Sequence, residues 1–196
     1  MTLVDLTREL VSIPSHRDEA AVGDFLEAWL RRETDADVRR DDVGNVIART
    51  GTGDETLALV GHHDVVEPVE SQVRSAEPGD GNGNEYVVEE RDNRLYGRGT
   101  ADMKGALAAA LVAFRDADPA GELVFASFVG EEVGGVGARH AIEQGFSPDY
   151  AVVGEGSTNY SGPDVTDVAV AHKGRRGSTI TARGTAAHAS EVDAGE

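Results

Sequence analysis

Cysteine is absent from the 196-residue sequence, so neither disulfides nor thiolate metal sites are available. Any bound metal must therefore use histidine, aspartate or glutamate. Long apolar runs are also missing, and no stretch reaches the ~18 apolar residues of a transmembrane helix. The N-terminal MTLVDLTREL lacks the basic start and apolar core of a signal peptide. We therefore expect a cytoplasmic protein without a membrane partner.

Positive charge, and lysine in particular, is scarce. Acidic residues number 36 and basic residues 18, which gives a formal net charge of −18, and only Lys104 and Lys173 are lysines. Such a surface repels the phosphate backbone, so we expect no nucleic-acid partner. An acid excess with few lysines is typical of a salt-rich cytoplasm, where screening weakens repulsion between like charges. We therefore predict a halophilic source.

Apolar residues, 39% of the chain, alternate between helix-like and strand-like segments. Their spacing predicts helices over residues 2–13, 17–33, about 103–117 and about 137–144. Short apolar runs predict strands over residues 45–49, 57–62, 122–129 and 150–155, of which 57–62 and 122–129 are expected to be buried. Residues 67–93 resemble a surface loop carrying a hairpin, and residues 167–185 resemble two further strands. The alternation predicts an α/β fold with a largely parallel central sheet and helices on both faces.

Polar side chains recur where the predicted strands end. Because ligands bind beyond the carboxyl ends of strands in such sheets, these side chains should share one edge. Four segments contribute to it: His62, His63 and Asp64; Asp102; Glu131 and Glu132; and Glu155. A lone histidine or acidic pair at a strand end usually has a structural or solvated role. Four such clusters at one edge indicate a functional site.

The chemistry of this set points to a metal. Crowded carboxylates repel one another unless a cation neutralises them. Imidazole and carboxylate ligands suit zinc, cobalt or manganese. The number of carboxylates suggests two ions, held together by a bridging carboxylate.

Strand alternation separates neighbouring side chains in these clusters. Residues two apart point the same way, so His62 and Asp64 are expected to be partners while His63 faces elsewhere. A carboxylate beside a ligating imidazole fixes its tautomer. The same rule would separate Glu131 from Glu132, so that one binds metal and the other stays free to act as a base.

Four segments resemble the successive signatures of the M20 family of dinuclear zinc amidohydrolases: GHHDVVEP, LYGRGTADMKGALAA, FVGEEVGGVGARH and VVGEGS. The resemblance covers nearly the whole chain in the family's order and spacing. It implies a zinc-peptidase-like catalytic domain over residues 1–172 and the beginning of an inserted α+β lid domain over residues 173–196. It also implies a cis peptide bond between Asp102 and Met103.

The resemblance further implies which residues hold two Zn²⁺ ions, with Co²⁺ or Mn²⁺ as alternatives. His62 and Glu155 would bind the first ion and Glu132 the second, while Asp102 would bridge both.

Three more residues receive catalytic roles from the resemblance. Asp64 would orient a metal ligand, and Glu131 would be the general base. His188 matches a lid histidine that, in dimeric relatives, reaches the partner's active site and stabilises the oxyanion; a surface role is the alternative. Three neighbouring basic residues could bind a substrate carboxylate or be surface charges near a hinge: Lys173, Arg175 and Arg176.

The sequence departs from the family pattern in two places. The chain stops at Glu196, early in the lid, before the family's last zinc-binding histidine, so we expect a fragment or a truncated product. The other histidines stand in the wrong contexts to replace it: His16, His63, His140 and His172. The fourth motif reads GEGS where many relatives have proline after the glutamate, which changes the turn and keeps the carboxylate.

These features predict hydrolysis of the amide bond of N-acyl amino acids, such as N-acetylornithine, N-succinyl-diaminopimelate or carrier-protein-linked lysine or ornithine. The enzyme would act on small substrates and form a homodimer through the lid. An aminoacylase, carboxypeptidase or dipeptidase of the same family is one alternative. A truncated, non-catalytic metal-binding remnant is another.

Overall fold

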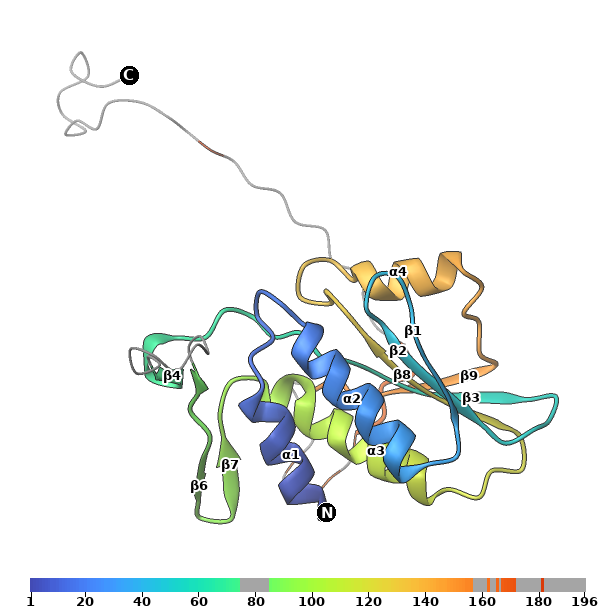
Figure 1. Cartoon of the computed structure of the whole chain (residues 1–196), viewed down its shortest axis with the longest axis horizontal. Coiled ribbons are helices and arrows are strands. Elements are labelled where there is room, and N and C mark those ends of the chain that lie inside the picture. Colours follow the sequence, from blue (N-terminus) through green and yellow to red (C-terminus); the bar gives the residue numbers. More distant parts are fainter. Residues whose placement is uncertain (75–84, 157–161, 163–164, 166, 172–180, 182–196) are drawn as a thin grey trace. The chain divides into compact units, whose positions relative to one another are not determined.

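The computed structural model describes residues 1–74, 85–156, 162, 165, 167–171 and 181 (Figure 1). The chain divides into two compact units, Met1–Ser157 and Thr158–Glu196. The first unit contains all the helices and strands described below. The predicted domain boundary at residue 172 lies outside the described residues and stays a prediction.

Two N-terminal helices form close to the predicted positions, α1 at Leu3–Ser12 and α2 at Ala20–Glu33. Thr2 caps α1, because its side-chain oxygen accepts the N–H of Asp5 at 3.2 Å and the Asp5 carboxylate accepts the N–H of Thr2 at 3.3 Å. Ile13 is extended. Pro14 disfavours helical backbone at the residue before it, so α1 ends there.

A five-stranded sheet forms the centre of the first unit, in the order β1-β2-β8-β3-β9. β8, β3 and β9 run parallel, whereas β2 pairs antiparallel with both β1 and β8. The sheet is therefore mixed, and its parallel part contains the three strands expected to deliver site residues. The strands span Asp37–Arg40 (β1), Val46–Thr50 (β2), Thr56–His62 (β3), Glu122–Phe128 (β8) and Tyr150–Val153 (β9).

The antiparallel part arises from the β1–β2 hairpin, whose first strand the apolar pattern did not predict. Its turn is built on Asp41, whose carboxylate accepts the backbone N–H groups of Val43, Gly44 and Asn45 at 2.8–3.1 Å. Gly44 has a φ of +105°, which a residue with a side chain rarely adopts. This short connection allows only antiparallel pairing.

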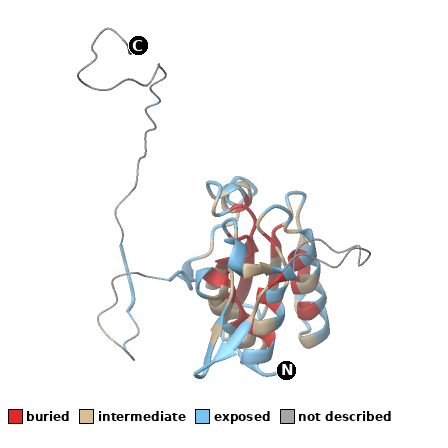
Figure 2. Ribbon diagram, turned by 90° about the vertical axis from the view of Figure 1, so that its left-hand side faces the viewer, coloured by how far each residue is buried: buried red, intermediate tan, exposed pale blue. Residues whose placement is uncertain are grey.

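Helices cover both faces of the sheet, as predicted (Figure 1). The helices α1, α2 and α3 (Gly105–Asp116) pack on one face, in a core that includes Trp29, Leu111 and Phe125. The helix α4 (Val136–Glu143) packs on the other face through Ala141. Figure 2 shows this buried material concentrated between the layers. No helix within the described residues is long and apolar enough to cross a bilayer.

Short elements fill the segment between β3 and α3. They are the 3₁₀ turn Glu70–Gln72, β4 (Val73–Arg74), β5 (Glu85–Tyr86), β6 (Glu89–Arg91) and β7 (Arg94–Tyr96). β6 and β7 form the hairpin expected in the loop, with Asp92 and Asn93 both at positive φ in its two-residue turn. The two strands predicted over residues 167–185 fall mostly outside the described residues, and residues 167–171 contain no strand.

β9 occupies the edge of the sheet beyond β3. Among the residues that the structure describes, its only partner strand is β3. All four of its residues, YAVV, are exposed, including Tyr150 at 60% and Val152 at 55%. This strand therefore carries an apolar sequence without the burial that parallel strands usually have.

The packing of α3 gives a stability prediction. Leu111 is fully buried, so Leu111→Ala should lower the free energy of unfolding by about 2–5 kcal/mol, because it leaves a cavity in the α1–α2–α3 core. Denaturant unfolding followed by circular dichroism measures this change. Ile142→Ala, at a residue 65% exposed, is the control and should change stability by less than ~0.5 kcal/mol. Equal effects would contradict this assignment of the core.

Candidate metal centre

The end of β3 places an oriented imidazole in the interior. His62 is 2% exposed and Asp64 is 3% exposed. The Nδ1 atom of His62 lies 3.0 Å from the main-chain oxygen of Asp64 and 3.3 Å from its carboxylate. Since Asp64 engages Nδ1, Nε2 is the nitrogen left to face the other acidic side chains.

The Asp64 carboxylate also holds the turn that follows β8. Its two oxygens accept the backbone N–H groups of Glu131 and Glu132, each at 3.0 Å. Burial alone raises the pKa of Asp64, but the hydrogen bonds from His62 and from these two N–H groups outweigh it and lower the pKa. One ionised carboxylate thus connects the ends of two adjacent parallel strands.

Two further carboxylates approach His62 from other segments. Asp102 lies in the turn Thr100–Lys104, hereafter the Asp102 turn, which precedes α3. Its Oδ1 is 3.1 Å from His62 Nε2, and Glu155, just after β9, lies 3.5 Å from the same nitrogen. The peptide bond between Asp102 and Met103 is cis, as the family resemblance implies.

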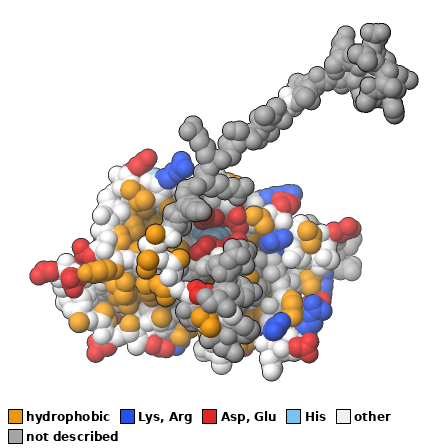
Figure 3. Space-filling view, turned by 180° about the vertical axis from the view of Figure 1, so that it is seen from behind, with side chains coloured by type: hydrophobic (Ala, Val, Ile, Leu, Met, Phe, Trp, Pro, Cys, Tyr) orange, Lys and Arg blue, Asp and Glu red, His pale blue; other side chains and the backbone are white. Residues whose placement is uncertain are grey.

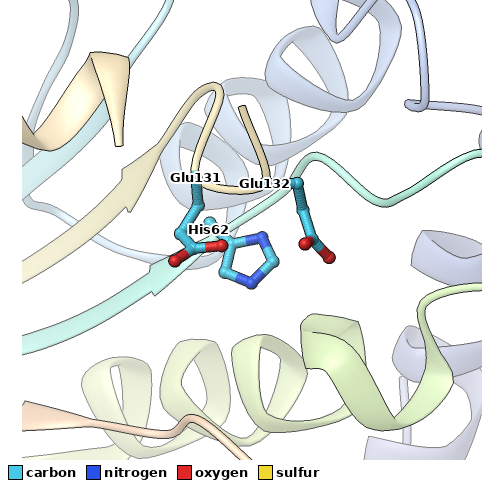
Figure 4. Close-up of side chains that lie close together, drawn as sticks. All are labelled: His62, Glu131 and Glu132. Carbon is cyan, nitrogen blue, oxygen red and sulfur yellow. The ribbon is translucent and has the colours of Figure 1, made fainter. Parts of the chain in front are cut away.

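These side chains form two overlapping groups around His62. Ligand atoms of His62, Asp102 and Glu155 lie within 4.8 Å of one another, and so do those of His62, Glu131 and Glu132. Figure 4 shows the imidazole between the two glutamates. In Figure 3 a histidine edged by acidic side chains lies in a hollow of the surface. The imidazole is buried, whereas Asp102, Glu131 and Glu155 are exposed, so the cluster is open to solvent.

The turn geometry changes one part of the sequence argument. Glu131 and Glu132 belong to a turn, so the alternation of side chains along a strand does not apply to them. Both carboxylates reach the neighbourhood of His62. Their predicted division of labour, Glu131 as base and Glu132 as ligand, therefore rests on the family resemblance alone.

The cluster has the electrostatics of a cation site. Burial lowers the pKa of His62, but Asp64, Glu155 and Asp102 together outweigh it and raise the pKa to about 9. Burial and the charge of Asp102 raise the pKa values of Glu132 and Glu155. Without a metal, His62 thus gains a proton that partly offsets the acids. One imidazole with several carboxylates and no thiolate fits a divalent ion such as Zn²⁺, Co²⁺ or Mn²⁺.

Three other histidines do not join this cluster. His63 is fully buried and its Nδ1 lies 2.7 Å from the hydroxyl of Ser127 on β8. Burial lowers its pKa to about 3. His16 bonds to the Tyr86 hydroxyl at 2.7 Å, and His140 on α4 lies 4.0 Å from Asp41. The predicted separation of His63 from His62 therefore agrees with the contacts.

Several predicted residues cannot be placed. His188 lies outside the described residues, so its role at the oxyanion stays a prediction. The same holds for His172 and for the basic residues after it, Lys173, Arg175 and Arg176.

Two residues near the cluster were not foreseen from the sequence. Glu19, at the start of α2, accepts the backbone N–H of Gly130, and burial and the charge of Asp64 raise its pKa. Nothing in its sequence context distinguishes it from neighbouring acids. Lys104, the last residue of the Asp102 turn, is fully buried, and burial lowers its pKa to about 7. The near absence of lysine elsewhere was a signal that could have identified it.

A mixed α/β sheet with helices on both faces and a histidine–carboxylate cluster at its carboxyl edge defines the class of zinc-peptidase-like hydrolase domains. Residues 58–193 match the model of Peptidase family M20/M25/M40, and the chain belongs to this family.

Curated relatives resemble the chain over most of its length. It is 31% identical to an acetylornithine deacetylase of Photorhabdus laumondii, over 98% of this chain and 50% of the relative. It is 34% identical to a succinyl-diaminopimelate desuccinylase of Stenotrophomonas maltophilia, over 90% and 47%. A LysW-lysine hydrolase of Deinococcus radiodurans is 37% identical, over 78% and 39%. The chain thus spans about half the length of these relatives or less.

A solved structure supports the fold. Human carnosine dipeptidase 1 superposes with a TM-score of 0.60 and 26% identity, over 77% of this chain and 37% of that one.

The neighbouring histidines provide a direct test of the cluster. His62→Ala should weaken binding of Co²⁺ or Zn²⁺ by more than about 100-fold, beyond the range expected for residues that only support a ligand. His63→Ala should affect metal affinity far less, because the imidazole of His63 bonds to Ser127 away from the carboxylates. Isothermal titration measures both, with circular dichroism to establish folding. A larger loss in His63→Ala would show that the wrong histidine has been assigned.

Proposed function

We propose that the protein is a metal-dependent amidohydrolase that cleaves the amide bond of N-acyl amino acids. The observation that carries this proposal is the convergence on His62 of carboxylates from three other segments, in a chain of the M20 family. The exposed rim of carboxylates over a buried imidazole leaves room for a small substrate to approach.

The chain's own residues would hold one divalent ion, Zn²⁺ in the first instance, and would supply two ligands, Asp102 and Glu132, to a second ion that lacks its histidine here and would bind weakly. His62 and Glu155 would bind the first ion, and Asp102 would be a ligand common to both ions. The carboxylates of Asp102 and Glu155 lie 3.1 and 3.5 Å from Nε2 of His62, which supports placing all three around one ion. Glu132 would serve the second ion. When bound, the ions supply Lewis acidity and lower the pKa of an attacking water.

Glu131 would act as the general base. Its carboxylate is exposed at the rim of the cluster, and its backbone is fixed by Asp64, so it can reach a water between itself and His62. It would take a proton from this water and return it to the leaving amine. Asp64 would keep the imidazole of His62 in one orientation, and His188 would stabilise the oxyanion.

The relatives favour particular substrates. The names of the curated relatives support N-acetylornithine, N-succinyl-diaminopimelate or lysine attached to a carrier protein. The likeness to human carnosine dipeptidase 1 favours a dipeptide as the second candidate. Residues Lys173, Arg175 and Arg176 would bind the substrate carboxylate. We further propose that the protein forms a homodimer through a complete lid domain, of which residues 173–196 are the beginning, in a salt-rich cytoplasm.

The role of Glu131 can be tested separately from metal binding. In protein loaded with Zn²⁺ or Co²⁺, Glu131→Gln should lower kcat/KM by at least about 100-fold, because the amide cannot accept a proton. Turnover is measured with N-acetylornithine, N-succinyl-diaminopimelate and a dipeptide, and metal affinity by titration. Glu143→Gln, at an exposed residue near the end of α4, makes the same chemical change away from the site and should be neutral.

If Glu131→Gln retains turnover, Glu131 is not the general base. Bound metal without turnover of any N-acyl amino acid or dipeptide by the unmodified protein would favour the non-catalytic metal-binding alternative.

A further inference from the structure

Lys104 occupies an unusual place for a lysine. It is fully buried, in a protein with only two lysines among 18 basic residues. Its Nζ donates to the main-chain oxygen of Ile13 at 2.6 Å and lies 5.7 Å from the centre of the Tyr86 ring. Burying an amino group is unfavourable unless a specific contact compensates for it. The hydrogen bond to Ile13 is the contact that compensates for the burial of Lys104.

Ile13 belongs to the connection between α1 and α2, whose first four residues, 13–16, are hereafter called the strap. The strap is bonded on several sides. The main-chain oxygen of Ser15 accepts the N–H of Val65 at 3.3 Å, and the Tyr86 hydroxyl accepts the N–H of Ser15 at 3.3 Å. Ser15 is 1% exposed. The strap is therefore a fixed part of the interior.

Two segments of the metal centre attach to this strap independently. The His62–Asp64 segment attaches through the N–H of Val65, and the Asp102 turn attaches through the side chain of Lys104. These segments are 40 residues apart in the sequence, yet His62 Nε2 and Asp102 Oδ1 lie 3.1 Å apart. Because both segments are attached to the strap, the strap offers a physical reason why His62 and Asp102 lie close together.

The Asp102 turn needs such an attachment because its backbone is irregular. Asp102 has φ −130° and ψ 97°, and Met103 has φ −129° and ψ 30°, so neither residue is helical. The N–H of Lys104 closes the turn on the main-chain oxygen of Gly99 at 2.8 Å. The side chain of Lys104 then fixes the closed turn to the strap.

We propose that Lys104 is a positioning residue of the metal centre, which holds the Asp102 carboxylate against His62 through its bond to Ile13. The inference rests on the proposed metal site and adds a residue that touches neither metal nor substrate. An N–H donor at the position of Nζ is the chemical requirement.

Arginine has N–H donors, but its larger guanidinium group would not place a single donor at the position of Nζ. The side chain of Lys104 passes close to the backbone of Gly99, because a Cβ placed on Gly99 would lie only 3.3 Å from Cδ of Lys104. The guanidinium group has five N–H donors, and one carbonyl would leave most of them without an acceptor. This accounts for a lysine at position 104 in a protein in which 16 of the 18 basic residues are arginine.

The absence of cysteine allows a chemical test. Lys104→Cys introduces a single thiol, which 2-bromoethylamine converts under denaturing conditions into a side chain with an amine at nearly the lysine length. Refolded samples are titrated with Co²⁺, and the affinity and visible spectrum are recorded. Unmodified Lys104→Cys and Lys104→Met should bind Co²⁺ about 10–100-fold more weakly, the range for residues that support ligands. Aminoethylation should restore the affinity and the spectrum, and Lys104→Arg should not.

Leu111→Ala is the control for a general loss of stability, because Leu111 lies in the same helix bundle and outside the strap; it should leave Co²⁺ affinity unchanged. Wild-type affinity and spectrum in Lys104→Met would overturn the inference, as would an aminoethylated protein that folds and still binds weakly. If Lys104→Met fails to fold, Lys104→Leu, which also lacks an N–H donor, gives the decision: weakened binding supports the inference and unchanged binding refutes it. If the unmodified protein binds no Co²⁺, the proposed metal site itself fails.

Discussion

The geometry of the site depends on one buried carboxylate, that of Asp64. It lies 3.3 Å from the imidazole of His62 and accepts backbone N–H groups from Glu131 and Glu132 at 3.0 Å each. A carboxylate so deeply buried is stable because donors on several sides face it. These bonds join the end of β3 to the turn after β8, so the imidazole and the two glutamates are placed together. The cluster is thus one connected unit.

The parts of the fold that the sequence predicted are those with strong local signals. Three continuous apolar runs identified β3, β8 and β9, and helical spacing identified α1 to α4 to within a few residues. Since parallel strands bring their carboxyl ends to one edge, the meeting of His62 and Glu155 followed from topology. Asp102 joins them from the turn before α3, which the parallel strands alone do not place. The partnership of His62 with Asp64 was predicted from their spacing and is confirmed, although β3 ends at His62 and the contact is made just beyond the strand.

The parts that were missed depend on contacts between distant residues. β1 reads DVRR, and one buried valine gives no strand pattern; the Asp41 turn creates the strand by folding it onto β2. Glu131 and Glu132 lie in a turn, where strand alternation has no meaning. The bond between Lys104 and Ile13 spans 91 residues, and no local pattern contains it.

The exposed edge strand β9 has a consequence for the chemistry. Among the described residues, His62 ends a strand with neighbours on both sides, whereas Glu155 follows a strand with one neighbour and no buried residue. Local opening requires the least free energy where few buried contacts hold the chain. Within the described part of the chain, the segment that carries Glu155 is therefore held by fewer buried contacts than the segment that carries His62. The centre thus joins a half that follows the buried ends of β3 and β8 to a half that follows the exposed strand β9.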